Sequence, residues 1–123
     1  MANRYLQQFY FSFVKKLTAV KGYVDIAADA SVSASSVVGG VVTKTGTGEY
    51  TLTLTDKYNA IVNANLTLQA ATAVDLVPQI VSQDVSGAKT VVFKLLTGAT
   101  ATNPAAVCRV YINLEMRNSS VAI

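Results

Sequence analysis

Hydrophobic and polar side chains alternate along much of the chain with the two-residue period of a half-buried strand. The clearest run lies near the C-terminal end, where one face carries Cys108, Val110, Ile112, Leu114 and Met116. A second run covers residues 49–55 and places Tyr50, Leu52 and Leu54 on one face, with polar residues on the other. The pattern therefore predicts strands over residues 106–116 and 49–55, each with one face in a core.

Glycines separate the strand over 49–55 from the segment before it. Gly39-Gly40 lies within the β-branched stretch 37–43, where it predicts a bulge or a sharp turn. Residues 45–48, Thr-Gly-Thr-Gly, predict a hairpin turn. Lys44 beside this turn raises the alternative of a phosphate-binding loop, but such a loop leads into a helix. Because an alternating strand follows here, the hairpin is the prediction.

The remaining segments complete an all-β pattern. Further strands are predicted over residues 20–26, 61–71, 74–83 and 90–96. Loops are predicted over 27–36 and 97–105, and a helical turn or short loop over 56–60. Residues 86–89 join the strands over 74–83 and 90–96 in a second hairpin. Pro78 favours a position at the edge of the sheet for the strand over 74–83. Seven or eight strands at this spacing are typical of an all-β, single-domain antiparallel β-sandwich or small barrel. The sequence leaves the choice between sandwich and barrel open.

The N-terminal segment is apolar on both sides of an extended run. Its two faces carry Phe9, Phe11 and Phe13 on one side and Tyr10, Ser12 and Val14 on the other. A strand of this kind is central in a sheet or covered by a second chain. We therefore expect an extended N-terminal arm or first strand over residues 1–19 and a β-domain over 20–123. The candidate interaction residues of the arm are Tyr5, Phe9, Tyr10, Phe11 and Phe13.

The composition indicates a surface with few charges. Hydrophobic residues make up 51% of the 123 residues and charged residues only 14%, below the roughly 25% of an ordinary soluble domain. A surface rich in Thr, Ser and Asn is typical of a protein that neighbours cover in an assembly. The net charge of +3 comes from dispersed basic residues, so we expect no nucleic-acid partner. No segment fits a signal peptide or a membrane span, and synthesis in a cytosol is expected.

Candidate chemistry is sparse. Histidine is absent, which removes the commonest general base and metal ligand. Asp25 and Asp29 are predicted to be solvated or to support a turn, and Cys108 is predicted to be a buried thiol. The tyrosines could stack on a sugar, but core or interface roles are the prediction for them; they are Tyr5, Tyr10, Tyr23, Tyr50, Tyr58 and Tyr111. We therefore expect no catalytic residue, no cofactor and no metal site.

Three stretches together resemble a known family. They are "GGVVTKTGTGEYTLTLTDKYNAIV", the valine-rich pair "PQIVSQDVSGAKTVVFKLL", and "RNSSV" after the closing strand. They are similar to small structural proteins of tailed-bacteriophage virions, particularly head decoration proteins, over residues 20–121. The most specific element is T-G-x-G-x-Y-T-x-x-L within residues 43–58.

The resemblance implies a non-enzymatic capsid decoration protein that binds the assembled head and bridges shell subunits. Its expected partners are the major capsid protein lattice and copies of itself, often as a homotrimer. Its expected location is the capsid surface of the virion, after synthesis in the cytoplasm of the bacterial host. The arm, residues 5–14, would dock by strand addition or apolar insertion on a neighbour or on the shell. The alternative is a tail- or fibre-associated adhesion module that binds a cell-surface glycan through exposed tyrosines.

Overall fold

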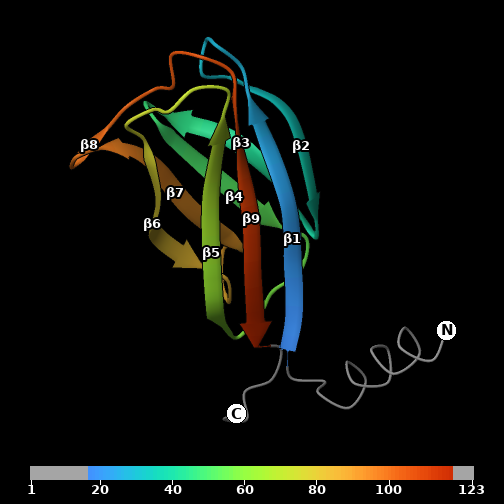
Figure 1. Ribbon diagram of the computed structural model, residues 1–123. Coiled ribbons are helices and arrows are strands. Elements are labelled where there is room, and N and C mark those ends of the chain that lie inside the picture. Colours follow the sequence, from blue (N-terminus) through green and yellow to red (C-terminus); the bar gives the residue numbers. More distant parts are fainter. Residues whose placement is uncertain (1–16, 118–123) are drawn as a thin grey trace, which may run out of the picture.

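The alternating segments pair into one antiparallel sheet of nine strands in the computed structural model, which describes residues 17–117. The strands are β1 (Leu17–Ile26), β2 (Val32–Val38), β3 (Gly40–Gly46), β4 (Glu49–Leu54), β5 (Ala60–Ala70), β6 (Val77–Asp84), β7 (Thr90–Thr97), β8 (Thr100–Ala101) and β9 (Cys108–Arg117). No helix occurs in the range from residue 17 to residue 117 (Figure 1). The predicted all-β class is confirmed, with one strand more than the pattern indicated.

The sheet bends into a barrel-like shape that is not fully closed. Its strand order is β5-β9-β1-β2-β3-β4-β7-β6, and the short β8 pairs with β7. Between β2 and β3 the register contains a single pair, Val37 with Gly40, so the sheet folds over at that point. Two four-stranded halves, β5-β9-β1-β2 and β3-β4-β7-β6, then face each other across the core (Figure 1). The structure thus resolves the choice between sandwich and barrel in favour of one nearly closed sheet.

The core contains the apolar faces that the alternation predicted. Every inward residue of β9 from Cys108 to Met116 is buried, as are Tyr50, Leu52 and Leu54 of β4. These side chains come from opposite halves of the barrel and meet in one hydrophobic cluster. Burial of such apolar surface is the main force that holds the halves together.

The predicted hairpins are confirmed. β3 and β4 pair around the turn at 45–48, where Gly48 has a φ of +61° that favours glycine. β6 and β7 pair around the turn at 86–89, and β6, which contains Pro78, is the last strand of the sheet. Gly39, with a φ of +99°, forms the sharp turn expected between β2 and β3.

The prediction of a loop over residues 27–36 is wrong for its second half. β2 begins at Val32 and pairs with β1 in an antiparallel register. Its small polar residues show no alternation because most of its side chains are exposed. The pairing depends on Gly22 of β1, where a Cβ would come within 2.1 Å of the Ser36 carbonyl oxygen. The loop predicted over 97–105 also contains a two-residue strand, β8.

Candidate interaction surfaces

The candidate residues of the arm lie outside the described residues 17–117. The structure therefore does not place Tyr5, Phe9, Tyr10, Phe11 or Phe13. The structure does show where residue 17, to which the predicted arm is attached, lies on the barrel. Leu17 pairs with Arg117 at the end of β9, and Arg117 pairs with Ala60 at the start of β5. The predicted arm thus joins the barrel at the end where β5 begins (Figure 1).

A polar and aromatic cluster occupies the outer face of β1 and β9. The Arg109 guanidinium donates to both carboxylate oxygens of Asp25, from Nε at 2.6 Å and from Nη2 at 3.1 Å. Its central carbon lies 3.8 Å from the centroid of the Tyr23 ring, which is a cation–π contact. Tyr111 completes the cluster, with its ring edge-on to Tyr23 at 6.4 Å and its hydroxyl donating to Gln69 of β5. Four strand residues thereby form a fixed, largely neutral platform.

The electrostatics of this platform follow from its hydrogen bonds. The bonds from Arg109 lower the pKa of the Asp25 carboxyl from its usual value of 3.8. The same bonds raise the pKa of the Arg109 guanidinium above its usual value. Both groups therefore stay charged and cancel each other. The surface they share with the tyrosines suits stacking and hydrogen bonding rather than acid–base chemistry.

This platform was not predicted from the sequence. A solvated or turn role was predicted for Asp25, whereas the structure pairs Asp25 with Arg109, 84 residues away. The turn role is confirmed for Asp29, whose Oδ1 accepts hydrogen bonds from the backbone N–H and hydroxyl of Ser31. The strand register, which places Asp25 opposite Arg109 and Tyr23 opposite Tyr111, is the signal that was needed.

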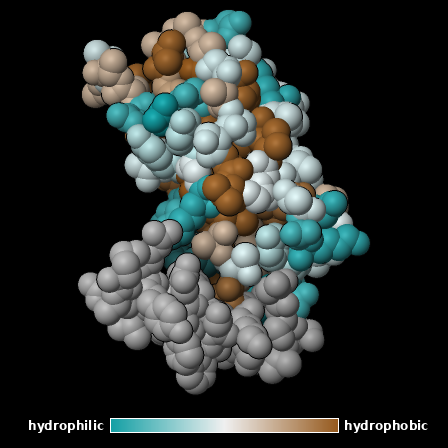
Figure 2. All heavy atoms as spheres, turned by 90° about the vertical axis from the view of Figure 1, so that its right-hand side faces the viewer, coloured by the Kyte–Doolittle hydropathy of each residue, from teal (hydrophilic) through white to brown (hydrophobic). Residues whose placement is uncertain are grey.

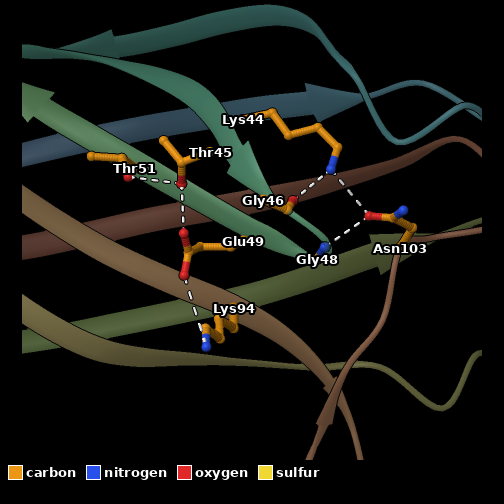
Figure 3. A network of polar contacts seen from close by, with 8 residues as sticks. All are labelled: Lys44, Thr45, Gly46, Gly48, Glu49, Thr51, Lys94 and Asn103. Carbon is orange, nitrogen blue, oxygen red and sulfur yellow. Dashed lines mark hydrogen bonds and ion pairs between the residues drawn. The ribbon is translucent and has the colours of Figure 1, made fainter.

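Lys44 and the Gly-Thr-Gly turn form part of a structural network (Figure 3). The Lys44 ammonium donates to the Gly46 carbonyl and to Oδ1 of Asn103, at 3.2 Å for the latter. The Gly48 N–H donates to the same oxygen at 2.7 Å. These bonds connect the β3–β4 turn to the loop after β8. The two backbones lie so close that a Cβ on Gly48 would be 2.6 Å from the Thr102 nitrogen. The hairpin interpretation of the turn holds, and Asn103 is a partner that its sequence context did not indicate.

The tyrosines divide between the core and the outer face. Tyr50 and Tyr58 are buried, and the Tyr50 hydroxyl donates to the Ala30 carbonyl at 2.7 Å. Burial raises the pKa of Tyr50 to about 12. Tyr23 is half-buried and Tyr111 is 41% exposed, so these two are the accessible aromatic rings among residues 17–117. Cys108 is buried as predicted, and burial raises the pKa of its thiol, which keeps the reactive thiolate rare.

Exposed apolar side chains gather near the turn from β2 to β3. Val38 is 77% exposed and Val41 58% exposed. Figure 2 views the side of the molecule on which β1 and β2 lie and shows apolar side chains along the middle of this face, between more polar ones. Exposed apolar groups of this kind are typical of surfaces that contact another protein.

Two cavities of the described domain have no charged residue in their lining. One, of about 90 Å³, lies beside Cys108, between the end of β5 with the loop 71–76 and the loop 104–107. A second, shallower recess of about 310 Å³ lies on the 70–76 loop. Ligand pockets usually measure about 300–1,000 Å³ and carry a few convergent polar side chains. Within residues 17–117, no three His, Cys, Asp or Glu side chains gather as a metal site would require.

In the part of the chain described, no helix is long and apolar enough to cross a membrane. Comparison of the chain with protein-family profiles, with curated proteins and with solved structures gave no match.

Proposed function

We propose that the protein is a non-enzymatic virion structural protein, a capsid decoration protein of a tailed bacteriophage. It binds the assembled head and stabilises it by bridging shell subunits. Its partners are the major capsid protein lattice and further copies of itself. The proposal starts from the resemblance of residues 20–121 to head decoration proteins.

One observation on the barrel carries the proposal. β2 and β5, which flank the outer face of one half, contain no charged residue. Their outward side chains are mostly Ser, Ala, Asn, Thr and Gln, and they are exposed. Neutral polar side chains lose less hydration energy on burial than charged ones, so these two strands suit contact with a symmetric shell. They lie on either side of the paired Asp25 and Arg109 of β1 and β9. The low charge of the whole chain supports the same reading.

The test is the location of the protein on virions produced from the genome that encodes this chain. Antibodies raised against the purified protein should label the heads in immunogold images, at many sites on each head. Labelling of tails or fibres alone would contradict the proposal. Pre-absorption of the antibodies with purified protein controls for unspecific label.

A second candidate function rests on the outer-face platform. Tyr111 presents an exposed ring, Tyr23 lies edge-on to it, and Gln69 and Arg109 supply polar groups at its rim. Aromatic rings with polar neighbours are able to stack on a sugar, as a tail- or fibre-associated adhesion module requires. Glycan-array binding that Tyr111→Ala abolishes and Tyr111→Phe preserves would favour this function, because the phenylalanine keeps the stacking face.

A further inference from the structure

β5 is an edge strand whose register with β9 shifts between Ile61 and Asn63, near its start, and is regular from Asn63 to Ala70. It is 11 residues long and pairs with β9 on one side, while no strand of residues 17–117 pairs with its other side. It contains neither a charged residue nor a proline. The opposite edge, β6, contains Pro78 and ends at Asp84. Natural proteins usually blunt exposed edges with such residues, so β5 is the edge able to accept a further strand.

The apolar side chains beside this edge are incompletely covered. We call the line where β5 and β6 approach each other without pairing the seam. The inward side chains of β9, one strand further in, are all buried. The inward side chains of β5 and their neighbours across the seam are only half-buried; they are Ala64, Leu66, Leu68, Leu76 and Ile80. The core of the barrel therefore reaches solvent along the seam.

We propose that residues 5–14 of a second copy of the chain pair with the free edge of β5 and cover the seam. The lengths agree, because ten residues of arm face the 11 residues of β5 at the same rise per residue. The alternation also agrees. Phe9, Phe11 and Phe13 share one face, which packs over the half-buried leucines of β5. This inference deepens the self-association that the proposed function includes and names its contact.

The position of residue 17 favours the arm of another copy over the chain's own arm. Leu17 lies on β1. The next strand in the sheet is β9, followed by β5, and the free edge is the far side of β5. The chain's own arm would have to cross three strand spacings, roughly 14 Å, before pairing. That crossing takes four or five residues at about 3.3 Å each and removes Phe13 from the paired stretch. An arm from a second copy keeps all three phenylalanines in the seam.

Cysteine cross-linking of the full chain tests the contact directly. Ser12 faces outward if the phenylalanines face inward, and Thr67 faces outward on β5, where it is exposed. Two single variants, Ser12→Cys and Thr67→Cys, are mixed and oxidised, and the expected product is a disulfide-linked dimer of the two. Asn65→Cys and Gln69→Cys, on the same face, cover a shift of register. Ser36→Cys, exposed on β2, is the matched control and should give no dimer with Ser12→Cys.

Light scattering of the purified protein supplies the second readout. The wild-type chain should have a mass of at least twice 13.0 kDa, and the Phe9→Ser, Phe11→Ser, Phe13→Ser triple variant should have the monomer mass. The control variant Tyr10→Ser, Val14→Ser changes the outward face and should remain associated. A wild-type monomer at every concentration would overturn the inference, and so would a failure of Ser12→Cys to form a mixed dimer with any of the three β5 variants. Both experiments use purified protein without virions. Their failure is therefore distinguishable from failure of the proposed function, which is tested on virions.

Discussion

The Arg109 guanidinium clamps the Asp25 carboxylate with two hydrogen bonds, of 2.6 and 3.1 Å, while its central carbon lies 3.8 Å from the Tyr23 ring centroid. This pair joins β9 to β1 across the outer face of the barrel. Two parallel N–H···O bonds also fix the orientation of the guanidinium, so the pair positions the ring surface around it.

The pair makes the stability of the fold depend on pH. Hydrogen bonding to Arg109 lowers the pKa of Asp25 in the folded state below 3.8. The stabilisation is therefore fully present above the unfolded value and is lost as the pH falls through the lowered folded value. Asp25→Asn should lower Tm at pH 7, and its difference from wild type should shrink as the pH falls below about 4.

Thermal unfolding at a series of pH values checks this dependence. Asp56→Asn is the matched control, because the Asp56 side chain forms no hydrogen bond or ion pair with residues 17–117 and should show a small difference at every pH. A Tm difference for Asp25→Asn that stays constant from pH 7 to pH 2 would contradict the account of the pair.

Core positions should be sensitive to truncation on both halves of the barrel. Leu52 on β4 and Ile112 on β9 are 1% and 3% exposed. Leu52→Ala and Ile112→Ala should each lower the free energy of unfolding by about 2–5 kcal/mol, because each leaves a cavity. Thr53→Ala, at the exposed position next to Leu52, should change it by less than about 0.5 kcal/mol. Urea denaturation measures all three, and equal effects at positions 52 and 53 would show the face assignment to be wrong.

Gly22 should be intolerant of a side chain because of a close backbone approach. A Cβ there would lie 2.1 Å from the Ser36 carbonyl oxygen and 2.5 Å from the Val37 Cα, so β2 would have to move. Gly22→Ala should cost about 1–3 kcal/mol of unfolding free energy. Gly46→Ala is the control, because its nearest neighbour is the flexible Glu49 carboxylate at 3.4 Å. If both variants unfold at the same urea concentration, β2 does not lie against β1 as described.

The Tyr50 hydroxyl should matter more than an exposed one. It donates to the buried Ala30 carbonyl, so Tyr50→Phe leaves that oxygen without its partner and should cost about 1–3 kcal/mol. Tyr111→Phe removes a hydroxyl that water is able to replace for Gln69, and its cost should be smaller. Urea denaturation compares the two variants, and a larger cost at position 111 would contradict the burial of Tyr50.

A spectroscopic titration gives an independent check on Tyr50. With its pKa raised to about 12 by burial, Tyr50 should ionise at higher pH than a free tyrosine, near 10. The difference in absorbance titration between wild type and Tyr50→Phe isolates this group. Ionisation of Tyr50 near pH 10 in the folded protein would show that the ring is not buried.

Much of the fold was predictable because its inward residues alternate. The run from Cys108 to Met116 and the run from Tyr50 to Leu54 gave correct strands with the correct buried face. β2 was not predictable in this way, since "SASS" at 33–36 has no apolar face to bury. Its strand conformation comes from pairing with β1, which Gly22 permits.

The surface clusters were less predictable than the core. Asp25 and Arg109 are 84 residues apart, and only the register of β1 with β9 brings them together. Asn103 likewise lies in a loop without a pattern, and folding brings it to the Gly48 N–H, 55 residues away in sequence. Contacts of this type depend on the completed sheet, so local spacing carries no signal for them. The predicted interaction residues of the arm remain predictions, because they precede residue 17.

Binding of the purified protein to assembled phage heads, produced from the genome that encodes this chain, tests the proposed decoration function. We expect saturable co-sedimentation with a fixed number of copies per head. We also expect decorated heads to break at a higher temperature than bare ones, because a partner that binds only the intact shell stabilises it. Protein that stays in the supernatant at every concentration, with unchanged thermal breakage of the heads, would contradict the proposed function.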